Sequence, residues 1–195
     1  MIVIADYGAG NVKSIENILE SLNVEYKVSS DKEEILFADA IIFPGQGHFG
    51  QAVKKLEETG MKECIIQAVT EKKIKFLGIC LGLQILFEKS EEAPNCKGLS
   101  ILNGSVKKFK SGKIPQIGWN NIETTENNDF LSDDFFYFVN SYYVEPSDEK
   151  IVSSRCEYGG VKFCSSVQKE NITAVQFHPE KSADAGKLFF QKWLG

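Results

Sequence analysis

The sequence lacks the features by which several large classes of protein are recognised. None of its apolar runs approaches the ~18 residues of a membrane-spanning helix, so no membrane partner is expected. The net charge is −5 and the basic residues form no block, so a nucleic-acid partner has no electrostatic support. The first residues, Met-Ile-Val-Ile-Ala-Asp, read directly as a strand and not as a secretory signal.

Cysteine and histidine are both scarce. The five cysteines are an odd number, are widely spread and contain no Cys-x-x-Cys pair. This pattern argues against a zinc site and a disulfide framework and favours the reducing cytoplasm. The two histidines are His48 and His178, so the search for a catalytic base is short.

Length and periodicity predict a single α/β domain over residues 1–195. Apolar strand-like runs alternate with segments of helical spacing, which is typical of an open, mostly parallel twisted sheet with helices on both faces, as in flavodoxin-like folds. The predicted strands of this half are 2–5, 24–29, 40–43 and 76–79, and the predicted helices are 12–22, 32–38 and 51–70, with a break near Gly60.

The second half of the chain changes character. Short β-prone stretches and turns occupy residues 94–144, and residues 151–156 and 161–167 read as a hairpin around two glycines. A last strand at 173–177 and an amphipathic helix at 183–194 close the chain. We therefore expect an added antiparallel β region in this half.

The chain is organised around Cys80, which lies between Gly78 and Gly82. A strand, a tight turn bearing a nucleophile and a helix beginning within 83–87 follow the logic of the Gly-x-Ser-x-Gly elbow, with cysteine in place of serine. The helix start favours a thiolate, and an N–H group there can stabilise an oxyanion. A buried structural cysteine is the alternative, but it would have little use for the flanking glycines.

His178 is the candidate base, because it follows a predicted strand as Cys80 does. The two side chains meet at one edge of the sheet if their strands are near neighbours. Glu180 is placed to orient His178, since Pro179 favours an extended backbone that projects both side chains to one side. These residues form a predicted Cys80–His178–Glu180 triad. His48, within the glycine-rich loop 44–50, is interpreted as structural or rim-facing.

Two motifs together resemble the class I, triad-type glutamine amidotransferases: Gly-Ile-Cys-Leu-Gly-Leu-Gln at 78–84 and Gln-Phe-His-Pro-Glu-Lys-Ser at 176–182. Further segments look like the glutaminase subunits of imidazole glycerol phosphate synthases. They are 6–11, 44–49, 91–94, 117–120 and 136–142.

The resemblance implies a glutaminase that forms a Cys thioester and passes ammonia to a (β/α)₈-barrel synthase (cyclase) subunit of a heterodimer, for histidine synthesis in the cytoplasm. It implies no cofactor and no metal. The oxyanion would be held by the N–H groups of Leu81 and of Gly47, and glutamine would be bound by Gln84 and Gly45. A solvated helix position is the alternative for Gln84. The residues implied at the partner face are Asn11, Trp119, Asn120, Tyr137 and Lys181.

Some positions leave alternatives open. Trp119 could equally pack in the core. Gln46 stands where a small apolar residue is usual in the family, and Gln116 and Asn140 stand where histidine is frequent. A related subunit that feeds ammonia to another synthase, for example in sugar amidation for surface polysaccharide, fits nearly as well. A cysteine hydrolase acting alone and a non-enzymatic flavodoxin-like binding module are the other readings.

Overall fold

The computed structural model describes residues 1–8 and 12–195. Its helices are α1 (Lys13–Ser21), α2 (Lys32–Leu36), α3 (Phe49–Thr59), α4 (Met61–Thr70), α5 (Leu81–Gln84) and α6 (Ala183–Leu194), with 3₁₀ turns η1 (Glu149–Ile151) and η2 (Pro179–Lys181). Its strands are β1 (Ile2–Ala5), β2 (Tyr26–Ser29), β3 (Ala40–Phe43), β4 (Lys75–Ile79), β5 (Lys89–Ser90), β6 (Gly104–Lys108), β7 (Gln116–Asn121), β8 (Glu123–Thr124), β9 (Phe135–Asn140), β10 (Tyr142–Pro146), β11 (Val152–Tyr158), β12 (Val161–Lys169) and β13 (Ile172–Val175).

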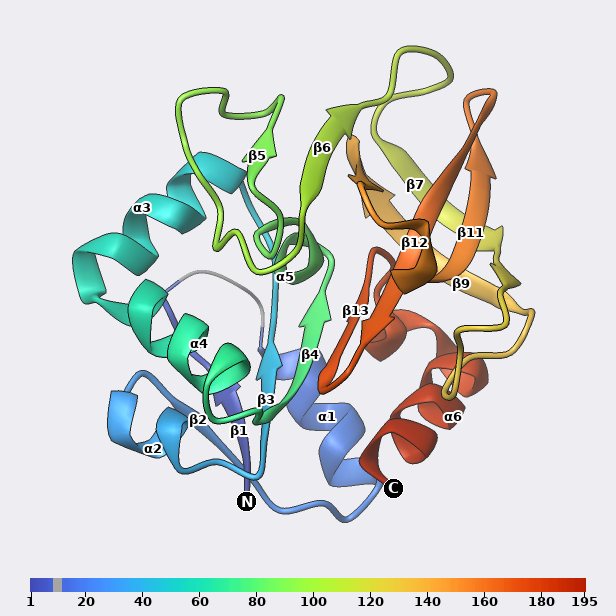
Figure 1. Ribbon diagram of the computed structural model, residues 1–195. Helices are drawn as coiled ribbons and strands as arrows, with labels where there is room; N and C mark the ends of the chain where they lie inside the picture. Colours follow the sequence, from blue (N-terminus) through green and yellow to red (C-terminus); the bar gives the residue numbers. More distant parts are fainter. Residues whose placement is uncertain (9–11) are drawn as a thin grey trace.

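The main sheet has the strand order β2-β1-β3-β4-β13-β12-β10-β6-β5 (Figure 1). The strands from β2 to β13 in this order are parallel, whereas β13, β12, β10 and β6 follow one another antiparallel. Outside this order, β11 pairs with β12 and β8, and β7 and β9 form a separate antiparallel sheet. The predicted parallel sheet with an added antiparallel region is confirmed.

Helices cover both faces of the parallel strands, as predicted. Val3 and Phe43 belong to a buried cluster that includes side chains of α3 and α4. Ile4 and Leu77 belong to a second cluster that includes side chains of α1 and α6, and Figure 1 shows these helix pairs on opposite sides of the strands. Successive residues of a strand point to opposite faces, so strands buried on both faces need continuous apolar runs.

The last strand, β13, returns to the middle of the sheet and lies parallel to β4. Val175 pairs with Ile79 at the carboxyl ends of these two strands. The residues that follow them, Cys80 and His178, therefore leave the sheet at the same edge.

The helix expected within 83–87 is not formed, and α5 is a single turn that ends at Gln84. Distant backbone groups capture the carbonyls that a longer helix would need. The amide of Leu99 donates to the carbonyl of Ile85 at 2.7 Å, and the amide of Leu102 donates to the carbonyl of Leu86 at 2.9 Å. A continued helix would require these oxygens for its own i to i−4 bonds.

Glycines mark the turns where the sequence predicted them. Gly60 adopts a φ of 64° and separates α3 from α4. Gly159 and Gly160 have φ values of 58° and 75° and join β11 to β12 in a two-residue hairpin turn. Both positive angles suit a type I′ turn, which matches the twist of antiparallel strands.

All five cysteines, each within the described part of the chain, are free thiols. Across residues 1–8 and 12–195, no helix combines the length and apolar character needed to cross a membrane.

Candidate active site

Cys80 occupies a strained turn directly after β4. Its φ of 53° and ψ of −105° lie outside the regions that non-glycine residues normally adopt. The flanking glycines are required by close backbone approach: a Cβ on Gly78 would lie 2.7 Å from the carbonyl oxygen of Gly82, and a Cβ on Gly82 would lie 2.4 Å from that of Phe43. The sequence interpretation of an elbow is therefore confirmed in its geometry.

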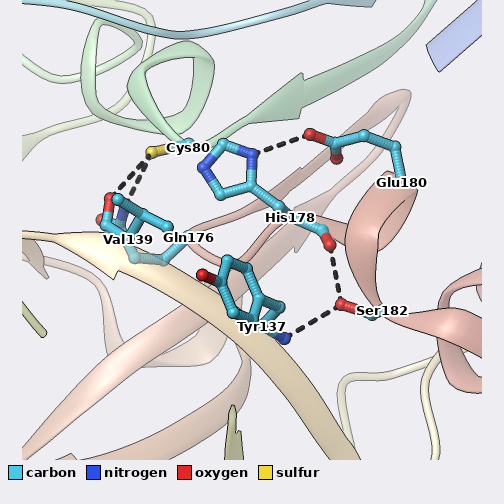
Figure 2. A network of polar contacts seen from close by, with 7 residues as sticks. All are labelled: Cys80, Tyr137, Val139, Gln176, His178, Glu180 and Ser182. Carbon is cyan, nitrogen blue, oxygen red and sulfur yellow. Dashed lines mark hydrogen bonds and ion pairs between the residues drawn. The ribbon is translucent and has the colours of Figure 1, made fainter. Parts of the chain in front are cut away.

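His178 and Glu180 form a buried pair beside this elbow. The His178 Nδ1 and Glu180 Oε1 atoms are 2.8 Å apart, and each side chain is 4% exposed. Figure 2 shows the imidazole between the Cys80 sulfur on one side and the Glu180 carboxylate on the other. The three side chains of the predicted triad are thus brought together.

The backbone around His178 is held from two sides. Its N–H donates to the carbonyl of Tyr137 at 2.8 Å, and its carbonyl accepts from the Ser182 hydroxyl at 2.6 Å. His178 itself is extended, but Glu180 lies in the 3₁₀ turn η2. The expectation that both residues share one extended stretch is therefore wrong, because the chain turns at Pro179 and the Lys181 amide bonds back to the His178 carbonyl at 3.0 Å.

The two neighbours of His178 set its ionisation. Burial of the ring disfavours the imidazolium and by itself lowers the pKa of His178. Negative charge on the Cys80 sulfur and the contact with Glu180 outweigh this and raise the pKa of His178 to about 10. This raised pKa favours the cationic ring at neutral pH, the form that can give a proton to a leaving group.

The Cys80 sulfur has further polar neighbours. The Gln176 side-chain amide donates to the sulfur at 3.5 Å, and the thiol reaches the Val139 carbonyl at 3.9 Å. Sequence reasoning missed Gln176. A signal was present, since side chains two residues apart on an extended chain point to the same side, and Gln176 precedes His178 by that spacing.

A cavity of about 460 Å³ opens over the elbow. It brings together the predicted site residues Gly45, Gly47, Leu81 and Gln84 with Cys80 and His178. Residues that sequence reasoning did not place here also line it, among them Glu92, Asn140, Ser141 and Tyr142. Lys181, expected at the partner face, is exposed and lines the same cavity.

The glycine-rich loop packs tightly against the elbow. A Cβ on Gly45 would lie 2.3 Å from the Gly82 nitrogen and 2.5 Å from the Leu81 nitrogen, so only glycine fits. Gly47 has a φ of 99°, and a Cβ on it would meet no atom of residues 1–8 or 12–195 within 4 Å. The next residue, His48, is exposed and caps α3, with its Nδ1 accepting from the Gly50 amide at 3.1 Å. His48 therefore has the structural role predicted for it.

Gln84 lies on the cavity wall but is 5% exposed. Its amide nitrogen donates to the Gln176 side-chain oxygen at 3.0 Å and to the Tyr142 carbonyl at 3.3 Å. It is not a solvated helix residue.

The residues expected at a partner face have different surroundings. Trp119 is 52% exposed, so it does not pack in the core, and its ring meets that of Tyr137 edge-on at 5.9 Å. Asn120 instead donates to the Glu157 carbonyl at 2.9 Å, because neighbours on a strand point to opposite faces. Asn11 lies outside the described residues.

The family-atypical positions Gln116 and Asn140 are opposite one another in the β7–β9 ladder. They are 3% and 5% exposed. Gln46 is half-buried and lines the cavity. Asn140 also lines the cavity.

Comparison with known proteins agrees with this geometry. The family model described as "Glutamine amidotransferase class-I" matches residues 3–194. Imidazole glycerol phosphate synthase subunit HisH 1 of Methanococcus maripaludis is 44% identical over 203 residues, covering 100% of this chain and 98% of that protein. Subunit HisH of Chlorobium chlorochromatii is 44% identical over 192 residues, covering 95% of each chain.

The fold is shared with solved structures. A crystal structure of a glutamine amidotransferase superposes with a TM-score of 0.80 at 21% identity, over 100% of both chains. The chain belongs to the class I glutamine amidotransferases. Within this class, it is a member of the HisH family of imidazole glycerol phosphate synthase subunits.

Proposed function

We propose that this chain is the glutaminase subunit of an imidazole glycerol phosphate synthase and that Cys80, His178 and Glu180 carry out its chemistry. The observation that carries the proposal is the strained elbow of Cys80 beside the buried His178–Glu180 pair, at the base of a cavity. The family model spans residues 3–194, which supports one amidotransferase domain over residues 1–195.

In the first half-reaction the Cys80 thiolate attacks the carboxamide carbon of glutamine. The resulting oxyanion is held by the Leu81 N–H and by an N–H of the 45–47 loop, for which we propose Gly47. Gly45 supports this arrangement because it packs directly on the Leu81 and Gly82 amides. One such donor contributes about 3–4 kcal/mol to transition-state stabilisation.

His178 gives its proton to the departing ammonia, leaving a thioester on Cys80. It then takes a proton from water, which attacks the thioester and releases glutamate. Glu180 holds the ring by its Nδ1 atom at 2.8 Å, so that the other ring nitrogen faces the sulfur (Figure 2). Protons balance over the cycle, because His178 begins and ends each turnover in the same protonation state.

The cavity has groups that complement glutamine. Glu92 supplies a carboxylate for the α-ammonium group of glutamine, and Lys181 supplies a cation on the same wall. Gln84 keeps its amide nitrogen for internal bonds, which leaves its oxygen as the atom that faces substrate.

We also propose that a barrel-shaped synthase (cyclase) subunit docks on the outer face of β7 and β9 and forms a heterodimer with this chain. This face exposes four apolar residues, Ile117, Trp119, Phe135 and Val139, and large exposed apolar patches mark interaction sites. Val139 also lines the cavity, so ammonia released at Cys80 leaves beside the docked partner. Tyr137 and Lys181 border the same face.

A cytoplasmic location completes the proposal, supported by the five free thiols. The catalytic assignment can be tested without the partner by treating the protein with a glutamine-analogue electrophile. We expect label on Cys80 well before Cys96, which is the cysteine of intermediate exposure, and protection by free glutamine. Equal labelling of the two, unaffected by glutamine, would favour a non-enzymatic binding module.

A further inference from the structure

A continuous series of amide hydrogen bonds ends on the reacting sulfur. It begins at the Tyr142 carbonyl, which accepts from the Gln84 amide nitrogen at 3.3 Å and from the Asn140 amide nitrogen at 3.0 Å. The Gln84 nitrogen also donates to the Gln176 side-chain oxygen at 3.0 Å, and the Gln176 nitrogen donates to the Cys80 sulfur at 3.5 Å.

The Tyr142 carbonyl determines which group is the donor and which is the acceptor in every hydrogen bond of this series. A backbone carbonyl can only accept, so Gln84 must present its NH₂ group to Tyr142. Gln176 must then present its oxygen to Gln84 and its NH₂ group to Cys80. Gln176 is 0% exposed, so solvent offers its amide no substitute partner.

The sulfur is consequently met by two donors from the same stretch of chain. Gln176 approaches from the side shared with Val139, and the His178 ring lies on the other side (Figure 2). A thiolate accepts hydrogen bonds, whereas a thiol must turn its proton toward an acceptor such as the Val139 carbonyl. Two converging donors therefore favour the thiolate form.

We propose that Gln176 is a further catalytic residue, whose amide N–H holds the Cys80 sulfur as a thiolate, and that Gln84 is a positioning residue that locks the Gln176 amide in this orientation through the Tyr142 carbonyl. The catalytic meaning of this assignment rests on the proposed glutaminase function. The hydrogen bond from Gln176 by itself affects only the fraction of Cys80 that is thiolate at a given pH.

The test is the pH dependence of Cys80 alkylation by iodoacetamide, followed on the Cys80-containing peptide by mass spectrometry. In Gln176→Met the N–H donor is lost, so we expect alkylation at neutral pH to slow about tenfold and its profile to move to higher pH. Gln67→Met, the same change at an exposed helix position, should match the wild-type protein.

Gln176→Leu is the second variant, because it also lacks the N–H donor but differs in shape from Met, so that a change common to both variants follows from the lost donor. It should move the profile in the same direction as Gln176→Met. A stably folded Gln176→Met or Gln176→Leu protein with an unchanged profile would overturn the role of Gln176.

A double-mutant cycle tests the positioning role of Gln84. We expect Gln84→Met to slow alkylation less than Gln176→Met does, and the double variant to be no slower than Gln176→Met alone. Fully additive effects would show that Gln84 does not act through Gln176. Alkylation requires no glutamine hydrolysis, so an inactive wild-type protein would contradict the proposed function and leave this test intact.

Discussion

Val175 and Ile79 pair at the carboxyl ends of two adjacent parallel strands, although they are far apart in the sequence. This pairing places Cys80 and His178 at one edge of the sheet. In the sheet, β13 lies directly beside β4. The nucleophile and its base are therefore brought together by the pairing of strands that are distant in the sequence. The candidate site is thus a product of topology as well as of motif.

The protonation of His178 gives the first prediction. Its pKa is raised to about 10, against the lowering effect of burial, by the charged Cys80 sulfur and by Glu180. Cys80→Ala removes one of the raising causes, so we expect the pKa of His178 to fall in that variant. NMR titration of the imidazole can follow this change, because only two histidines are present. An unchanged His178 titration in Cys80→Ala would contradict the imidazolium–thiolate pair.

Glu180→Gln tests the orienting carboxylate. The amide keeps the shape of Glu180 but loses the charge that faces His178 Nδ1 at 2.8 Å. We expect kcat for glutamine hydrolysis to fall by about 10²- to 10⁴-fold, with a smaller change in KM. The comparison with wild type should be made at equal folded fraction, measured by circular dichroism. A kcat within twofold of wild type would remove Glu180 from the mechanism.

The two loop glycines should respond differently to alanine. In Gly45→Ala the new Cβ meets the Leu81 and Gly82 nitrogens at 2.5 and 2.3 Å, so the loop must move away from the elbow. We expect unfolding free energy to drop by about 2–3 kcal/mol and hydrolysis to be largely lost. In Gly47→Ala the new Cβ meets no atom of the described part of the chain within 4 Å, so the substitution should cost only the strain of its positive φ, about 1 kcal/mol.

Urea denaturation and glutaminase assays of both variants check this prediction. Equal destabilisation by the two substitutions would show that close packing of Gly45 on the elbow is unimportant.

Trp119→Ala tests the proposed docking face. Because Trp119 is 52% exposed, its removal should leave the melting temperature nearly unchanged. A central aromatic residue of an interface contributes about 2 kcal/mol or more, so the Kd for the synthase subunit should rise about 30-fold. Phe37→Ala, at a position 81% exposed and remote from β7 and β9, is the matched control. Equal affinities of the two variants, measured by calorimetry, would place the interface elsewhere.

Local features of the sequence predicted much of this structure. The apolar run 40–43 and the amphipathic segment 183–194 coincide with β3 and α6. The glycines around Cys80 predicted the elbow, because glycine is required there by a local contact in which two peptide groups approach too closely for a side chain.

The remaining features depend on distant contacts. The length of α5 is set by the amides of Leu99 and Leu102, which capture carbonyls beyond Gln84. Gln176 acquires its place beside Cys80 only because β13 pairs with β4. Asn120 belongs to a segment that resembles the family. Because side chains alternate along a strand, it points toward Glu157 and away from the face of Trp119. Pairing between segments far apart in sequence leaves no periodic signal in either segment.

Glutamate release from glutamine tests the central claim most directly. Four mixtures suffice: the chain alone, the chain with a barrel synthase subunit, that pair with the nucleotide ligand of the synthase, and Cys80→Ala in the complete mixture. The account predicts low release by the chain alone, a large rise in the complete mixture and none with Cys80→Ala. Undiminished release by Cys80→Ala would contradict the catalytic assignment, and wild-type release that ignores the synthase would contradict the proposed partner.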